Sequence, residues 1–349
     1  MLYKTNNPHG GDVYVEPVLL DYSANTNPFG IPDGVKKAIC GMLDKAYYYP
    51  DPYCRELVRK IAENENVPED HILCGNGAAE LIYSYFEAVS PRKIAEIAPT
   101  FTGYSEALQS TDCAIVRYGL SRNNGFDLNE GILDFLAEEK PDVFVICNPN
   151  NPTGRLVKPS LMEKILVCCH KNNIRLFIDE CFLDLAGENA GMKSYLDKYK
   201  NLFILKAFTK SYAMAGVRLG YCMSADSSLL EKMSRKVQPW NVSSIAQTAG
   251  IAALSEHGFL EKAREYIKHE RNRLSDRLEE FGFWVCPSDA NYLLFCGKED
   301  LDIKLKEKGI AIRNCSNYQG LGLGWFRIAV RLHEENEVLL DAIKMICER

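Results

Sequence analysis

A polar turn after a short apolar run carries the residues best suited to covalent chemistry. Residues 202–205 read LFIL, which is typical of a buried parallel strand, and Thr209, Lys210 and Arg218 follow it. Burial at the mouth of such a strand favours the neutral amine of Lys210, which can attack an aldehyde. The Arg218 guanidinium and the Thr209 hydroxyl could hold a phosphate group. A single lysine in a solvated turn would read the same way, so this interpretation requires further parts of a site.

The elements that would position this turn are alternating short strands and helices between residues 67 and 225. Their alternation predicts an α/β fold with a mostly parallel sheet. In such sheets ligands bind at the carboxyl ends of the strands. The apolar runs predict strands at residues 93–98, 143–147, 175–178 and 202–205.

Polar or aromatic residues follow each of these predicted strands. Phe101 could stack on a flat heterocycle, and Asp179 needs a cationic partner such as a protonated ring nitrogen. The glycine turn before Ala78 and Ala79 reads as strand, turn and helix, so their amides could bind a phosphate. Asn151 lies in the turn N-P-N-N-P-T-G. Each feature has a local alternative in packing or turn formation.

In chain order, the glycine turn, P-T-F, N-N-P-T-G, D-E, and T-K-x-Y with G-x-R resemble the fold-type I enzymes that depend on pyridoxal phosphate (PLP). These belong to the class I/II aminotransferase superfamily, and the resemblance covers the whole chain. It implies a large domain with a mostly parallel sheet and a small α+β domain. Lys210 resembles the lysine that forms a Schiff base with PLP, and Asp179 the carboxylate on the pyridine nitrogen. The other cofactor residues that the resemblance implies are Asn151 at the ring hydroxyl, Phe101 stacked on the ring, and Thr209, Arg218, Ala78 and Ala79 at the phosphate.

The resemblance also implies residues outside the predicted cofactor pocket. Tyr49 resembles the tyrosine that reaches the partner subunit's cofactor phosphate, which predicts a homodimer with shared active sites. Arg327 resembles the arginine that binds the substrate carboxylate. Two positions depart from the common pattern, since Phe182 replaces a frequent tyrosine and Ala207 replaces a frequent serine or threonine.

Within the superfamily the chain resembles the histidinol-phosphate aminotransferase branch. The segments H-G-G-D, D-Y-S-A-N-T-N-P-F-G, D-E-C-F, P-W-x-V and R-N-C-S-N-Y-x-G-L resemble the L-threonine-O-3-phosphate decarboxylases of cobalamin biosynthesis. The resemblance implies decarboxylation of L-threonine O-3-phosphate to (R)-1-aminopropan-2-yl phosphate. The alternatives are an aminotransferase of the histidinol-phosphate type and a PLP-binding protein without turnover, against which Lys210, Asp179 and Arg327 count.

A phosphorylated amino acid needs cationic and amide groups to bind its two anionic groups. The predicted substrate residues are His9, Asn25, Asn27, Arg313, Arg327 and Arg331. The sequence leaves open which arginine binds the carboxylate and which binds the phosphate. It also leaves open whether threonine phosphate or serine phosphate is preferred.

Composition narrows the class of protein further. The net charge of −6 argues against nucleic acid or an anionic membrane as the main partner. No apolar run reaches the roughly 18 residues that a membrane helix needs. The 13 cysteines are scattered without metal-ligand spacing, which predicts reduced, packed thiols, no metal site and a cytoplasmic location.

The predicted domain organisation has three segments. Residues 1–45 form an N-terminal arm and part of the small domain, residues 46–250 form the large PLP-binding domain, and residues 251–349 form an interdomain helix and the small C-terminal domain. Apolar spacing predicts helices over residues 32–45 and through Leu57, Val58 and Ile61. Residues 245–281 are predicted to form one long helix that joins the domains.

Overall fold

The computed structural model describes residues 13–14, 18–187 and 190–348 of the chain. Its larger sheet has the strand order β2-β8-β7-β6-β5-β3-β4. β8 is antiparallel to both of its neighbours, and the remaining pairs are parallel, as the sequence predicts. The strands are β2 (Ile72–Gly75), β3 (Lys93–Ala98), β4 (Ala114–Gly119), β5 (Val143–Cys147), β6 (Arg175–Asp179), β7 (Leu202–Ala207) and β8 (Gly220–Met223).

The central strands are apolar on both faces, because helices cover both faces of the sheet. Side chains of a strand alternate between faces, so neighbours in sequence enter different cores. Ile146 and Ile204 join one apolar cluster with helices on one face, whereas Val145 and Phe203 join another cluster on the opposite face. This two-sided burial explains why continuous apolar runs predicted these strands.

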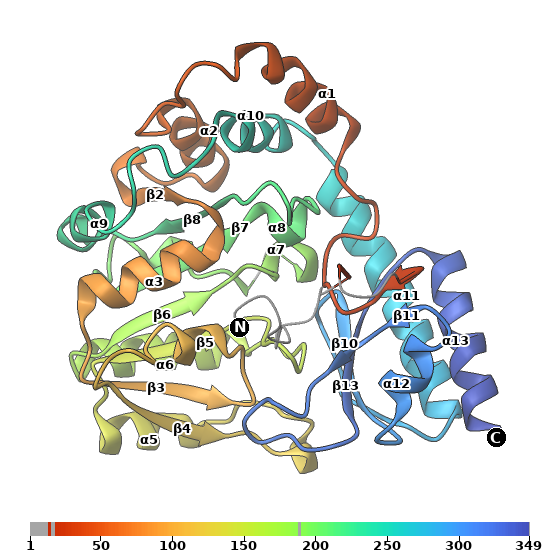
Figure 1. Cartoon of the computed structure of the whole chain (residues 1–349). Coiled ribbons are helices and arrows are strands. Elements are labelled where there is room, and N and C mark those ends of the chain that lie inside the picture. The colour runs from red at the N-terminus through yellow and green to blue at the C-terminus, as the bar shows by residue number, and fades with distance from the viewer. Residues whose placement is uncertain (1–12, 15–17, 188–189, 349) are drawn as a thin grey trace.

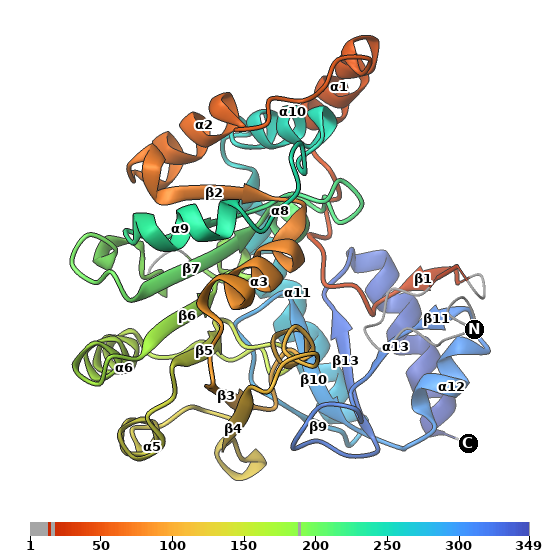
Figure 2. The ribbon, with the colours of Figure 1, turned by 60° about the vertical axis from the view of Figure 1, so that its left-hand side comes forward.

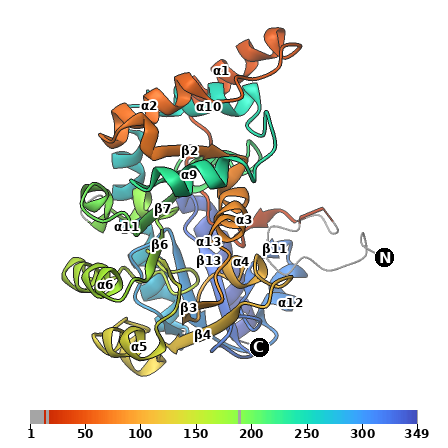
Figure 3. The same cartoon turned by 90° about the vertical axis from the view of Figure 1, so that its left-hand side faces the viewer.

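Helices of the large sheet lie in two layers (Figures 1 and 3). α3 and α9 pack together on one face, and α5 and α6 pack together on the other. α1, α2 and α10 gather beyond β2 (Figure 1). The helices of this part are α1 (Asp33–Met42), α2 (Arg55–Glu65), α3 (Gly77–Val89), α4 (Gly103–Glu106), α5 (Gly131–Glu139), α6 (Pro159–Lys171), α7 (Leu183–Ala186), α8 (Phe208–Ser211), α9 (Ser227–Ser234) and α10 (Ser244–Ala253).

A smaller antiparallel sheet of order β12-β13-β10-β9 packs with three helices beside the large sheet (Figure 2). A separate parallel pair, β1 with β11, joins the N-terminal segment to this unit. The elements are β1 (Leu20–Asp21), α11 (Phe259–Glu280), β9 (Trp284–Val285), β10 (Tyr292–Cys296), α12 (Leu301–Lys306), β11 (Ile310–Ala311), β12 (Arg313–Asn314), β13 (Trp325–Ala329) and α13 (His333–Cys347). The predicted fold class of a large parallel sheet with a small α+β unit is therefore confirmed.

The prediction of one long helix over residues 245–281 is wrong. α10 ends at Ala253 and α11 begins at Phe259, with Gly258 in the left-handed region at φ +76°. The two helices serve different cores: Ala249 of α10 packs in the large-sheet cluster, whereas Ile267 of α11 packs in the small-unit cluster. A turn between them lets each helix follow its own core.

The N-terminal segment links the small unit to the turn that carries Lys210. The Ala329 amide donates to the Tyr22 carbonyl at 2.9 Å, and the Asn27 amide donates to the Lys210 carbonyl at 3.0 Å. In the part of the chain that the structure describes, no helix has the length and apolarity to cross a membrane. All 13 cysteines are free; twelve of them are buried or half-buried, whereas Cys40 is exposed, so the prediction of packed thiols is wrong for Cys40.

Candidate active site

A cavity of about 450 Å³ lies at the carboxyl ends of the large-sheet strands, beside the small unit. Its lining joins segments that are far apart in sequence, from the N-terminal segment to β13. Ten of the predicted residues line this one cavity: Asn25, Ala78, Ala79, Phe101, Asn151, Asp179, Thr209, Lys210, Arg218 and Arg327.

Lys210 lies on α8, one turn after β7. Burial lowers the pKa of its amine to about 8, and the positive charges of Arg327 and Arg218 act in the same direction. At pH 8, Lys210 would then be neutral in half of the molecules, whereas an ordinary lysine is neutral in roughly one molecule in 300. A neutral amine is the nucleophile that an aldehyde requires.

We expect the rate at which Lys210 reacts with an aldehyde to rise with pH and to level off above a midpoint near pH 8. The reason is that burial and the positive charge of Arg327 lower the pKa of the Lys210 amine to about 8, so the amine loses its proton near that pH. Stopped-flow absorbance on mixing the apoprotein with PLP at a series of pH values measures this rate. Arg327→Gln should move the midpoint upward, because it removes a positive charge. A wild-type midpoint near the ordinary lysine value would contradict the assignment.

Asp179 is the last residue of β6 and lines the cavity. Its Oδ2 accepts a hydrogen bond from the Tyr104 hydroxyl at 2.6 Å, and its Oδ1 accepts one from the Cys181 amide at 2.9 Å. Each carboxylate oxygen has a second lone pair, so Asp179 can still accept from a protonated ring nitrogen. The Tyr104 contact was not predicted, although Tyr104 lies in the segment P-T-F-T-G-Y after β3.

Glycines leave room for an anion-binding cradle at the beginning of α3. A Cβ on Gly77 would lie 2.5 Å from the Arg218 guanidinium, and a Cβ on Gly220 would lie 2.7 Å from the Ala78 amide nitrogen. Gly77 also has φ +80°, which disfavours any other residue. The guanidinium therefore lies against the free amides of the helix, where a phosphate binds well.

Two buried polar groups in the cavity lack partners within the described residues. Both amide atoms of Asn25 and the Nε of Arg327 make no hydrogen bond there. The rest of the Arg327 guanidinium is fixed, because it donates to the Ser23 carbonyl at 2.7 Å and to the Asn151 side chain. Buried polar groups normally have partners, so these atoms point to a polar ligand.

We expect Asn25→Ala to raise the KM for a phosphorylated amino acid by about 10- to 100-fold, the value of a hydrogen bond to a charged group. Thermal stability should not fall, since the Asn25 amide makes no hydrogen bond within the described part of the chain. Asn27 is the matched control, because its side chain donates to the Ser211 carbonyl at 2.9 Å and accepts from the Phe29 amide at 3.0 Å. Asn27→Ala should therefore lower the free energy of unfolding by about 1–3 kcal/mol. A loss of stability for Asn25→Ala without a change in KM would refute the substrate contact.

Four other predicted residues do not line this cavity. Asn27 instead binds the backbone carbonyls of Lys210 and Ser211. Arg313 donates to Asn317 at 2.9 Å and stacks on Tyr318, which itself lines the cavity. Arg331 pairs with Glu335 at 2.9 Å, and Tyr49 is exposed and packs on Trp240. The substrate roles of Asn27, Arg313 and Arg331 stay predictions, as does that of His9, which lies outside the described residues.

Several residues of the cavity were not predicted from the sequence. Cys147, Cys181 and Tyr318 line it, and the Tyr318 hydroxyl lies 3.5 Å from Asn151. Phe182 also lines it, with the Lys210 amine 5.6 Å from the ring centre. Phe182 therefore presents an apolar ring to the cavity, without the hydroxyl of the tyrosine that is frequent at this position in the family.

A desolvated lysine, a carboxylate for a ring nitrogen and a glycine-lined phosphate cradle fit PLP. On the large parallel sheet, they define a PLP-dependent enzyme of fold type I. The chain belongs to the aminotransferase class I and II family, whose model matches residues 17–343.

Individual relatives agree with this family. The chain is 35% identical to threonine-phosphate decarboxylase from Salmonella typhimurium over 353 residues, which cover 98% of this chain and 97% of the relative. It is similar to the solved histidinol-phosphate aminotransferase from Clostridium acetobutylicum, with a TM-score of 0.88, 29% identity, and coverage of 95% and 99% of the two chains. It also shares its fold with the histidinol-phosphate aminotransferase from Sinorhizobium meliloti solved with PLP, with a TM-score of 0.87, 20% identity, and coverage of 99% and 96%.

Proposed function

We propose that the protein decarboxylates L-threonine O-3-phosphate to CO2 and (R)-1-aminopropan-2-yl phosphate, a reaction of cobalamin biosynthesis. The single observation that carries the proposal is that one cavity is lined both by the desolvated Lys210 and by polar atoms of Arg327 and Asn25 that have no hydrogen-bond partner among the described residues. The 35% identity to a threonine-phosphate decarboxylase supports the choice of reaction.

In this proposal each residue has a physical role. PLP, when bound, supplies an electron sink for the bond that breaks at Cα of the substrate. Asp179 would hold the positive ring nitrogen, Asn151 would bind the ring hydroxyl and Phe101 would stack on the ring. Thr209, Arg218 and the amides of Ala78 and Ala79 would hold the cofactor phosphate. Arg327 would bind an anionic group of the substrate, and Lys210, in its protonated form, would deliver the proton that replaces CO2 at Cα.

The second candidate is transfer of the amino group of histidinol phosphate. The similarity to the solved histidinol-phosphate aminotransferase of Clostridium acetobutylicum, at 29% identity, favours it. Both reactions need the same cofactor residues, and they differ in which bond at Cα breaks.

A product assay separates the two candidates. Full-length protein with PLP is incubated with phosphothreonine, phosphoserine or histidinol phosphate, each with and without 2-oxoglutarate. CO2 release from phosphothreonine without 2-oxoglutarate is the expected result. Glutamate formation from histidinol phosphate, without CO2 release from phosphothreonine, would establish the aminotransferase instead. If the pocket contacts the extra methyl group of phosphothreonine, phosphothreonine should be preferred over phosphoserine by about 10- to 200-fold.

We further propose that two copies of the chain complete each site, with Tyr49 reaching the partner's cofactor phosphate. Exposed aromatic side chains around Tyr49 support this proposal, because aromatic residues are enriched at protein interfaces. Tyr49 is 81% exposed, and Tyr47, Tyr48, Tyr53 and Trp240 are also exposed nearby in the chain or in space.

We expect Tyr49→Phe to leave the dimer intact and to weaken PLP binding by about 10- to 100-fold, as for loss of a hydrogen bond to a charged group. Equilibrium dialysis of PLP and sedimentation velocity measure the two quantities. Tyr48→Phe is the control, because Tyr48 is also an exposed tyrosine but has no predicted contact with the cofactor. Unchanged PLP affinity in Tyr49→Phe, or a monomeric wild type, would refute the shared site.

The domain boundaries and the compartment also remain proposals. We place the large domain at residues 46–250, flanked by the segments 1–45 and 251–349. The free thiols of all 13 cysteines support a reducing compartment such as the cytoplasm.

A further inference from the structure

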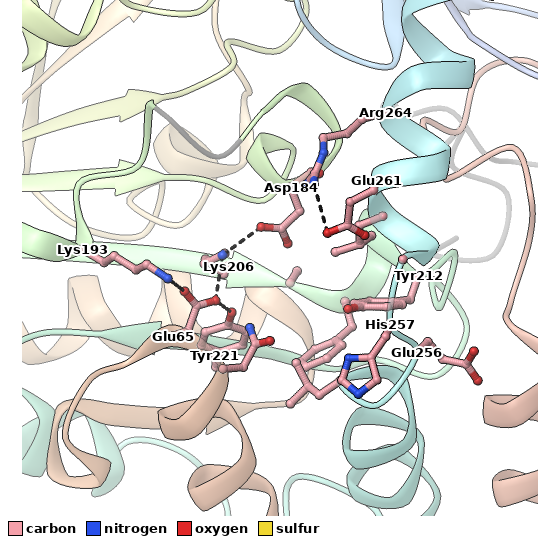
Figure 4. Close-up of a pocket in the computed structure, with 16 residues that line it drawn as sticks. Glu65, Asp184, Lys193, Lys206, Tyr212, Tyr221, Glu256, His257, Glu261 and Arg264 are labelled. Carbon is pink, nitrogen blue, oxygen red and sulfur yellow. Dashed lines mark hydrogen bonds and ion pairs between the residues drawn. The ribbon is translucent and has the colours of Figure 1, made fainter.

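A second cavity, of about 250 Å³, has Phe208 of α8 in its wall and is drawn in close-up in Figure 4. Phe208 and Tyr212 line this second cavity, whereas Thr209 and Lys210 line the first. Residues of α2, α7, β7, β8 and the beginning of α11 complete its walls. The short helix that carries Lys210 thus lines both a ligand cavity and a cavity rich in charged side chains.

Four charged side chains of the second cavity form one connected network, namely Glu65, Asp184, Lys193 and Lys206. The Lys206 amine lies 2.8 Å from the Glu65 carboxylate, and the Lys193 amine also lies 2.8 Å from it. Glu65 and Lys206 are 2% and 7% exposed, so neither could remain charged without a partner. Burial opposes the charge of Glu65, but Lys206 and Lys193 lower its pKa to about 2.

Asp184 connects this network to the residue after Lys210. Its Oδ1 lies 2.8 Å from the Lys206 amine, and its Oδ2 accepts a hydrogen bond from the Ser211 hydroxyl at 2.9 Å. The Arg264 guanidinium, from α11, donates to the Asp184 backbone carbonyl at 3.1 Å. Asp184 therefore touches β7, α8 and the helix of the small unit.

Asn27 binds the backbone of α8. Its backbone amide donates to the Lys210 carbonyl at 3.0 Å, and its side chain donates to the Ser211 carbonyl at 2.9 Å. The backbone of α8 is thus bound through Asn27, while the Ser211 side chain is bound through Asp184. A four-residue helix has few hydrogen bonds of its own, so these external contacts fix its position.

We propose that Asp184, held by Lys206 and Glu65, is a positioning residue for Lys210 that acts through Ser211. This inference rests on the proposed role of Lys210 toward PLP. Asp184 touches neither the first cavity nor any reacting atom. Its effect is geometric, because small displacements of a reacting group cost large factors in rate.

The test compares apoprotein variants by the rate of absorbance change on adding PLP and by thermal stability. When the Lys210 amine condenses with the PLP aldehyde, a C=N bond forms and one water leaves. Ser211→Ala removes only the hydroxyl that reaches Asp184, and Asp184→Asn removes the ion pair with Lys206. Both variants should slow this reaction about 10-fold or more at a saturating PLP concentration. Ser211→Ala should still unfold in a cooperative transition, which shows that the slower rate does not come from misfolding. Lys193→Met is the matched control, since it removes a salt bridge of the same network without touching Asp184.

The outcomes separate this inference from the proposed function. Slow condensation in Ser211→Ala with normal rates in Lys193→Met supports the positioning role. A wild-type rate in Ser211→Ala overturns it, even if Asp184→Asn fails to fold. If wild-type protein shows no PLP adduct at Lys210 at all, the proposed function itself fails.

Discussion

Lys210→Ala should abolish turnover and the borohydride-reducible adduct between protein and PLP. Lys210 is the lysine that lines the first cavity, and burial lowers its pKa to about 8, so it supplies a reactive amine there. Lys206, although buried nearby, lines the second cavity, and its pairing with Asp184 and Glu65 keeps it charged despite burial. The loss of one acid–base group alone costs about 10²- to 10⁴-fold. Because Lys210 would also be the amine that binds PLP, we expect turnover to fall below detection.

Lys210→Arg sharpens the same test. Arginine keeps a positive charge in the cavity but does not lose its proton in proteins, so it cannot act as the amine nucleophile. It should be as inactive as Lys210→Ala if the amine carries the reaction. Substantial activity in Lys210→Arg, or a reducible adduct in either variant, would show that another group reacts with PLP. Mass spectrometry of the reduced wild-type protein identifies the modified lysine.

The sequence predicted the central strands well because burial on both faces leaves continuous apolar runs. β3 and β5 match their predicted ranges, and β6 extends only one residue further, to Asp179. β4 was not predicted, because it lies at the edge of the sheet and alternates exposed with partly buried residues. The break between α10 and α11 was also missed, since both halves have helical spacing and only the two separate cores reveal the turn.

The gathering of most of the predicted cofactor residues in one cavity could be predicted, because these residues lie at the carboxyl ends of neighbouring strands. Contacts between distant segments could not be predicted in this way. Tyr104 donates to Asp179 across 75 residues of sequence, and Lys206 pairs with Glu65 across 141. No local pattern marks such pairs, because they depend on how the strands and helices pack. The Asn25 amide atoms, which have no hydrogen-bond partner in the described part of the chain, likewise become visible only when the surrounding side chains are in place.

Asp179→Asn should retain bound PLP and lose most activity, on the order of 10²-fold or more. The amide has nearly the same shape and can still accept one of the hydrogen bonds from Tyr104 and Cys181. It lacks the negative charge that keeps a ring nitrogen protonated. The phosphate cradle and Lys210 remain, so absorbance should still report bound PLP while steady-state kinetics report the loss of kcat.

The adjacent Glu180 provides the matched control for Asp179→Asn. Glu180 is buried at the same strand end, and burial raises its pKa to about 7 although Lys206 opposes this. Its carboxylate accepts from the Met192 amide at 3.0 Å and does not line the first cavity. Glu180→Gln should therefore keep kcat within a few-fold of the wild type. If the two variants lose activity equally, the charge of Asp179 has no special role and its contribution is to packing. A normal kcat in Asp179→Asn would exclude this carboxylate from the chemistry altogether.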